Sequence, residues 1–235
     1  MEDSERYCRI NSQDWRFVPS LLRHYAETAC HHRVRVALTT IPVVYVKGQY
    51  NHLIARRLQE LGVDSRLMPP STPLEKFEAM GVDALVMGGG PQSVRSLDGL
   101  TSELREASNL MTKIKLPMLC ICVTHQLMAT TFGGMTNLAR KPEFGPVEVS
   151  VSDEDSILAG LKPSFTAWES HNDEIVAAPP GFKVLASSDN CTVQAMRHEK
   201  MNLFGVQFHP EVYHTLKGAD VFKNFLKVVN DDKRS

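Results

Sequence analysis

Residues 116–126 read Leu116-Pro117-Met118-Leu119-Cys120-Ile121-Cys122-Val123-Thr124-His125-Gln126, an apolar run placed directly before a helical one. The run 117–121 predicts a buried β-strand, and a helix is expected from about 124 to 132, where Gly133-Gly134 would end it. Cys122 falls where the strand turns into the helix, the arrangement of a nucleophile elbow. The turn exposes the side chain, and the helix N-terminus favours the thiolate, which is the reactive form. Cys122 is therefore a candidate nucleophile, whereas Cys120, inside the strand, is expected in the core.

The segments on both sides of this stretch repeat the order of strand and helix. Upstream, apolar strands are expected at 41–46 and 83–87, and helices at 53–61, 73–80 and 97–113. Unalternated apolar strands between helices indicate a parallel sheet covered on both faces. Beyond Pro146, strand-like stretches are expected at 147–151, 165–168, 182–186, 192–196 and 203–208, before a closing helix over 219–229. The predicted fold class is α/β, with a mostly parallel central sheet flanked by helices on both faces.

Length and composition predict one domain with an additional segment before it. The chain has 235 residues, enough for one sizeable α/β domain, which is predicted over residues 41–235. Residues 1–40 are predicted to be an N-terminal extension of unknown role. The formal net charge of −1 argues against broad binding to nucleic acid or an anionic membrane. No apolar run approaches the ~20 residues that span a bilayer, and no signal-peptide core is visible, so a cytoplasmic protein is expected.

The cysteines do not predict a disulfide framework or a metal site. An odd number of cysteines at scattered spacings is not typical of paired disulfides. The run Cys30-His31-His32 could bind a metal together with Cys8, but no second pair has ligand spacing. A polar loop is the preferred interpretation of that run, and no metal is expected.

A second informative segment is Gly205-Val206-Gln207-Phe208-His209-Pro210-Glu211, a strand that ends in His-Pro-Glu. In an extended backbone, His209 and Glu211 project to the same side. Pro210 gives the sheet no hydrogen-bond donor, which suits the end of a strand. A carboxylate beside an imidazole fixes its tautomer and stabilises the imidazolium, while the other ring nitrogen faces a nucleophile. Together with Cys122, these residues predict a Cys-His-Glu triad.

Several motifs resemble those of a known family. Residues 116–126 are similar to the active-site stretch of class I (triad type) glutamine amidotransferases, and Gly205–Glu211 resembles that family's second signature. Gly88-Gly89-Gly90-Pro91-Gln92-Ser93 resembles its glycine loop. Three further stretches resemble, more narrowly, the separate amidotransferase subunit of archaeal two-subunit GMP synthase; they are 48–56 (GQYNHLIAR), 168–174 (WESHNDE) and 209–215 (HPEVYHT). The resemblance, which runs from about Ile41 to the last helix, implies a flavodoxin-like fold with a smaller antiparallel β portion.

The resemblance also implies a role for each motif residue. Cys122 would attack the side-chain carboxamide of glutamine, and His209, oriented by Glu211, would protonate the departing ammonia and then activate water against the thioester. Backbone N–H groups of Gly90 and Val123 would hold the oxyanion. The groups implied for binding the amino-acid end of glutamine are Gly89, Gln126 and the backbone of Ser170 and His171.

The same resemblance implies a partner. Ammonia would pass to a separate ATP-pyrophosphatase synthetase subunit, most consistently one that converts XMP to GMP, so the chain would be the glutaminase of a ligase complex in purine nucleotide biosynthesis. The sequence has no Ser-Gly-Gly-x-Asp-Ser loop for ATP. We therefore expect no cofactor in this chain, with ATP and Mg²⁺ on the partner.

Two positions depart from the family pattern and leave alternatives open. Cys120 and Thr124 stand where relatives usually have glycine, two residues before and after the nucleophile. Thr124 is β-branched and stiff, although it could cap the following helix. One alternative is an amidotransferase that serves another synthetase, of the anthranilate or aminodeoxychorismate type. Another is a catalytically inactive regulatory subunit with the same fold.

Overall fold

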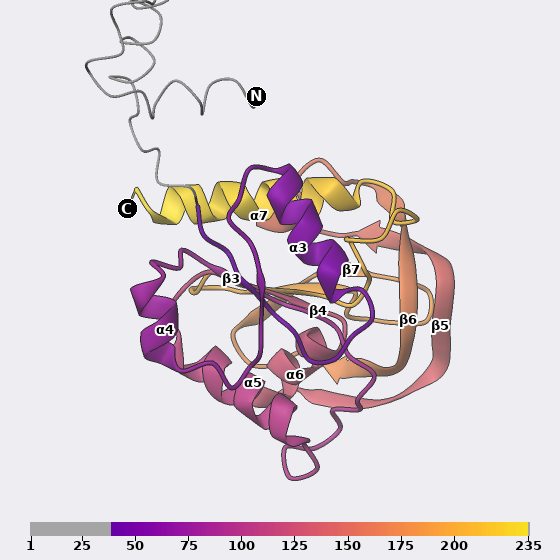
Figure 1. The fold of residues 1–235 in the computed structure, drawn as a ribbon. Helices are drawn as coiled ribbons and strands as arrows, with labels where there is room; N and C mark the ends of the chain where they lie inside the picture. Colours follow the sequence, from indigo (N-terminus) through magenta and orange to yellow (C-terminus); the bar gives the residue numbers. More distant parts are fainter. Residues whose placement is uncertain (1–38, 235) are drawn as a thin grey trace, which may run out of the picture. The chain divides into compact units, whose positions relative to one another are not determined.

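The computed structural model describes residues 39–234, so residues 1–38 of the predicted extension lie outside the described part. The described strands form a sheet in the order β2-β1-β3-β4-β9-β8-β7-β5-β6 (Figure 1). They are β1 (Val43–Val44), β2 (Leu67–Met68), β3 (Leu85–Met87), β4 (Met118–Ile121), β5 (Met135–Val151), β6 (Ser164–Ala177), β7 (Phe182–Ser187), β8 (Ala195–His198) and β9 (Leu203–Val206). The helices are α3 (Asn51–Glu60), α4 (Leu74–Ala79), α5 (Ser102–Lys113), α6 (Val123–Thr131), the 3-10 turn η2 (Ser156–Leu158) and α7 (Gly218–Asp232). Among the described residues, no helix is long and apolar enough to cross a bilayer.

Strands β2, β1, β3, β4 and β9, which are neighbours in this order, pair in parallel. Helices cover both faces of this part of the sheet (Figure 1). Side chains alternate across β4, so Leu119 and Ile121 join one apolar cluster with α3 and α7. Met118 and Cys120 join the other cluster, with α4, α5 and α6. Figure 1 shows α3 and α7 on one side of the sheet and α4, α5 and α6 on the opposite side. The predicted parallel sheet, flanked by helices on both faces, is confirmed.

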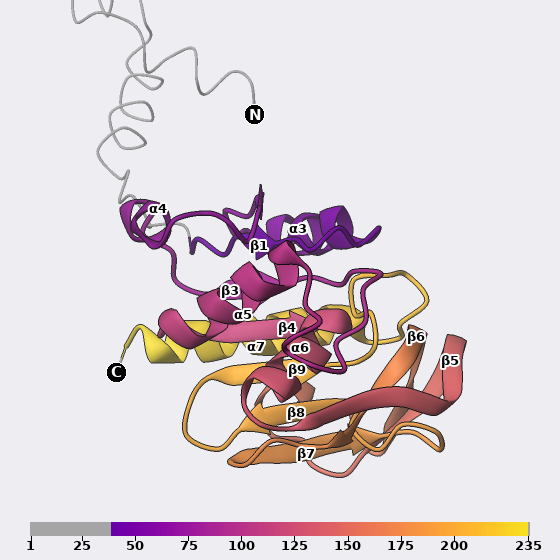
Figure 2. The same cartoon turned by 90° about the horizontal axis from the view of Figure 1, so that it is seen from below.

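The remaining strands are antiparallel, and β5 and β6 form a long hairpin. Figure 2 shows the two strands of this hairpin side by side at the edge of the sheet, beyond β7 and β8. The sequence predicted strands only at 147–151 and 165–168, whereas β5 begins at Met135 and β6 ends at Ala177. The predicted strands were therefore too short. Ser170 and His171, outside the predicted strands, lie within β6.

The parallel strands place four segments at one edge of the sheet. β1, β3, β4 and β9 run in the same direction, so their carboxyl ends meet. The segments that follow these ends are residues 47–51, the glycine loop 88–93, the elbow at Cys122, and Gln207–Glu211. Parallel pairing therefore brings together the motifs that are far apart in the sequence.

Candidate active site

Cys122 occupies a sharp turn between β4 and α6. Its backbone has φ 57° and ψ −115°, a conformation that L-residues rarely adopt and that is typical of strained functional positions. The turn is held because the Cys122 N–H donates to the Val206 carbonyl at 2.8 Å. The side chain is 5% exposed and lines a cavity. The nucleophile elbow predicted from the sequence is present, and the neighbouring Cys120 is fully buried, which raises the pKa of its thiol.

The elbow tolerates the β-branched Thr124 because the hydroxyl of this residue bonds to the neighbouring strands. Its hydroxyl donates to the Met87 carbonyl at 2.7 Å and accepts from the Ile121 N–H at 2.9 Å. The side chain is fully buried between the ends of β3 and β4. Thr124 does not cap α6, the role that the sequence left open for it, because its hydroxyl bonds to Met87 and Ile121 in the preceding strands. Thr124 instead ties the elbow to the strand before the glycine loop.

We expect Thr124→Val to destabilise the protein although the side chain keeps its shape. The change leaves the Met87 carbonyl and the Ile121 N–H without this partner, which costs about 1–3 kcal/mol for an unsatisfied buried group. In a protein of this length each kcal/mol lowers Tm by about 2–4 °C. Thermal unfolding followed by circular dichroism measures the shift. Thr124→Ser keeps the hydroxyl and is expected to lose less; equal losses in both variants would contradict the assignment.

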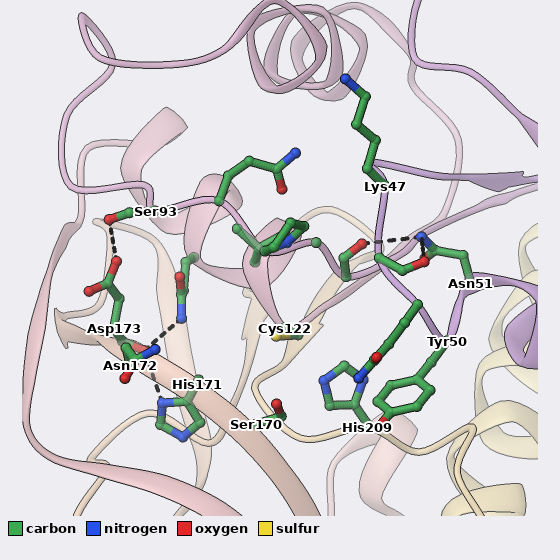
Figure 3. A pocket seen from close by; sticks show the side chains of 18 of the residues that line it. Lys47, Tyr50, Asn51, Ser93, Cys122, Ser170, His171, Asn172, Asp173 and His209 are labelled. Atoms are coloured by element: carbon green, nitrogen blue, oxygen red, sulfur yellow. Dashed lines mark hydrogen bonds between the residues drawn. The ribbon is translucent and has the colours of Figure 1, made fainter.

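His209 lies between Cys122 and Glu211. Its Nδ1 is 2.7 Å from Glu211 Oε1, and the ring lines the same cavity as Cys122. Burial of the ring by itself lowers the pKa of His209, but the negative charges of Cys122 and Glu211 outweigh burial and raise the pKa well above its usual value. This favours the imidazolium form of His209. The structure thus brings together the three residues predicted to form a triad, and Figure 3 shows Cys122 and His209 in the same cavity.

The triad is held by contacts that the sequence motifs did not assign. Tyr50 packs edge-on against the His209 ring, with ring centroids 5.2 Å apart. The His209 N–H donates to the Trp168 carbonyl at 3.0 Å. Thr215 donates to the His209 carbonyl at 2.6 Å and accepts from the Trp168 N–H at 2.9 Å. These residues lie inside the quoted motifs, so the motifs indicated where such contacts could occur but not which residues make them.

A cavity of about 720 Å³ opens beside Cys122. All the residues predicted to bind substrate or the oxyanion line it: Gly89, Gly90, Val123, Gln126, Ser170 and His171. A Cβ on Gly89 would lie 3.2 Å from His209 Cε1 and 3.5 Å from Cys122 Cβ. One on Gly90 would lie 2.4 Å from the Val46 carbonyl oxygen. Side chains at both glycines would therefore crowd the main chain or the triad, which suits backbone contact with a substrate.

The side chains of Gln126 and His171 are committed to the protein. Gln126 Nε2 donates to the Asp173 carbonyl at 2.7 Å and to Gln207 Oε1 at 3.0 Å. His171 Nδ1 lies 3.0 Å from the same carbonyl, and its Nε2 is 3.1 Å from Glu143 Oε2. For His171, the group left to face a substrate is the backbone, as the family resemblance implied.

Asp173 joins the glycine loop to β6. Its carboxylate accepts from Ser93 Oγ and from both Nε and Nη2 of Arg95, the latter at 2.9 and 2.6 Å. Figure 3 shows the Ser93–Asp173 pair on one wall of the cavity. The sequence did not predict this contact because the partners lie about eighty positions apart and carry no shared local pattern.

Among the described residues, one cluster of possible metal ligands includes His171 of the cavity wall. Ligand atoms of Glu143, His171 and Cys191 lie within 4.8 Å of one another. Each oxygen of the Glu143 carboxylate already accepts two hydrogen bonds. Oε1 accepts from Ser188 and Asn190, and Oε2 accepts from His171 and Gln194. The neighbouring Glu169 is fully buried, and burial raises the pKa of its carboxyl well above the usual value. The cluster is therefore better described as a buried hydrogen-bond network than as a metal centre.

Comparison with known proteins is consistent with this geometry. Residues 43–229 match the family model of "Glutamine amidotransferase class-I". The glutamine-hydrolysing GMP synthase subunit of Sulfolobus acidocaldarius is 48% identical over 80% of this chain and 97% of its own length. The corresponding protein of Thermococcus kodakarensis is 42% identical over 78% of this chain and 95% of its own. The crystal structure of a protein from Thermoplasma acidophilum, described as a GMP synthase subunit, has a TM-score of 0.77 at 36% identity, covering 84% of this chain and 96% of that chain.

Proposed function

The chain belongs to the class I glutamine amidotransferase family, and from this premise we propose that it is the glutaminase subunit of a two-subunit GMP synthase. The observation that carries the proposal is the assembly of Cys122, His209 and Glu211 beside one cavity. The sequences most informative about the product are the relatives named as glutamine-hydrolysing GMP synthase subunits, which this chain matches along almost their whole length.

In the proposed reaction Cys122 Sγ attacks the carboxamide carbon of glutamine. The oxyanion that forms is held by backbone N–H groups of Gly90 and Val123, both of which line the cavity. His209 gives its proton to the leaving nitrogen, so ammonia departs and a thioester remains. His209 then takes a proton from water, which attacks the thioester, releases glutamate and restores the thiolate. Glu211 keeps the imidazole oriented through both steps.

The substrate side of the cavity is proposed to be formed by Gly89, Gln126, Ser170 and His171. Gln126 Nε2 is committed to Asp173 and Gln207, so its Oε1 is the atom that would accept from the α-ammonium group of glutamine. Ser170 and His171 present their backbone along β6. An extended strand offers N–H and C=O groups at regular spacing, which suits an amino-acid zwitterion.

The ammonia acceptor is proposed to be bound by a separate synthetase subunit, which would also bind ATP and Mg²⁺. This chain would then need no cofactor, because the thiolate, imidazolium and backbone donors supply what amide hydrolysis requires. A cytoplasmic location is part of the same proposal, since the synthetase would use ATP and nucleotide monophosphates.

The test is to mix the purified chain with an ATP-pyrophosphatase subunit of GMP synthase and to measure GMP formation from XMP. We expect glutamine to support GMP formation only when both chains are present, while ammonia supports it with the synthetase alone. Anthranilate formation with the corresponding synthase partner, in place of GMP, would favour the other amidotransferase hypothesis. If neither partner elicits glutamine hydrolysis, the chain is an inactive relative.

A further inference from the structure

We infer that the side-chain amide of Gln207 donates a hydrogen bond to Cys122 Sγ, the nucleophilic atom, and holds it in place. This deepens the proposed function. Gln207 directly follows β9 and is fully buried. Its Nε2 lies 3.9 Å from Sγ, a long hydrogen bond to a sulfur acceptor. Gln207 does not line the cavity, so it reaches the sulfur from the protein side while a substrate would approach from the other.

The orientation of the Gln207 amide is fixed by its neighbours. The Asp173 carbonyl can only accept, so the Gln126 group 2.7 Å from it must be the amide nitrogen. That nitrogen also lies 3.0 Å from Gln207, which must therefore present its oxygen. The Gln207 nitrogen is then left facing Cys122 Sγ. The chain of bonds from Asp173 through Gln126 and Gln207 permits the sulfur to act only as an acceptor in this contact.

This arrangement gives Gln207 an effect on the charge of the sulfur. A thiolate accepts a hydrogen bond more strongly than a thiol, because bonds to a charged group are the stronger ones. The contact therefore stabilises the thiolate, in addition to the effect of the His209 imidazolium on the other side. It also restricts rotation of the Cys122 side chain, which keeps Sγ aimed at the cavity. Gln207 is thus a positioning residue, and its signal in the sequence is its place two residues before His209.

The first test follows alkylation of Cys122 by iodoacetamide in the full chain as a function of pH, with the site read by peptide mass spectrometry. Gln207→Met keeps the side-chain length but removes the donor. We expect the pH of half-maximal alkylation to rise by about half to one unit, the shift expected from one hydrogen bond. Gln59→Met also removes a side-chain bond, to the Ser65 carbonyl outside the cavity lining, and should leave that pH unchanged. An unchanged pH in folded Gln207→Met would overturn the inference.

A second measurement needs no variant at position 207. In the 15N-labelled native chain, the Gln207 side-chain amide signal should move with pH at the same midpoint as Cys122 alkylation, because its acceptor changes charge. In Cys122→Ala this movement should disappear. A signal that does not respond to pH in the native chain would contradict the contact. Neither measurement involves XMP or the synthetase, so failure of the proposed function and failure of this inference give different results.

Discussion

Cys122→Ala is expected to lower glutamine-dependent GMP formation by the chain and its synthetase by about a million-fold, the loss found when the nucleophile of a triad is removed. Without Sγ no thioester can form, so the proton that His209 would give to the leaving nitrogen is not used. Ammonia-dependent GMP formation by the same mixture should stay unchanged, since ammonia bypasses the cavity beside Cys122. The measurement is the ratio of the two rates at saturating nucleotide.

Cys120→Ala is the matched control for this change. Cys120 is two residues away, fully buried in β4, and packed in the cluster that faces α5 and α6. Removing its sulfur leaves a small apolar cavity, which costs stability and not chemistry. We therefore expect glutamine-dependent activity to remain within a few-fold of the native level. Substantial glutamine-dependent synthesis by Cys122→Ala would show that another residue is the nucleophile.

Local patterns in the sequence identified the elbow and the His-Pro-Glu turn because each depends on residues close together in the chain. Cys122 was identified from a strand that runs directly into a helix, and His209 and Glu211 from their spacing on an extended segment. Their convergence followed from the parallel order of the strands, whose carboxyl ends must meet at one edge. The triad residues and their convergence at one edge of the sheet were therefore predictable from the sequence alone.

Contacts between distant segments were not predictable in this way. The Thr124 hydroxyl bonds to Met87, thirty-seven positions away, and only the register of β3 against β4 makes that possible. The Gln207–Cys122 contact is equally nonlocal. The strands of the β5–β6 hairpin were predicted too short for a different reason. The first part of β5 has polar and exposed residues on both faces, so hydrophobic alternation, the main sequence signal for a strand, is absent there.

Glu211→Gln is expected to lower glutamine-dependent kcat by about ten-thousand-fold, the loss seen when the carboxylate of a triad becomes an amide. The amide keeps the shape but cannot stabilise the imidazolium, and it can hold the ring in the wrong tautomer. It also shifts the pH dependence. Glu211 helps to raise the pKa of His209, so without it the pKa falls. The imidazolium is then lost at lower pH, and the alkaline limb of the rate profile should move to lower pH.

The rate of glutamine hydrolysis, measured between pH 5 and 10, separates the shift of the alkaline limb from a loss of folding. This range includes the usual pKa of histidine, about 6.5. Glu148→Gln makes the same chemical change at an exposed position of β5, and we expect it to leave kcat and the alkaline limb where they are.

The raised pKa of His209 also makes the stability of the folded protein depend on pH. Because the folded-state pKa is raised, the stabilisation is complete below the unfolded pKa and is lost as pH rises through the folded one. Glu211→Gln should therefore reduce stability most at neutral and acidic pH. A variant whose alkaline limb stays in place while kcat falls would mean that Glu211 orients the ring without setting its charge.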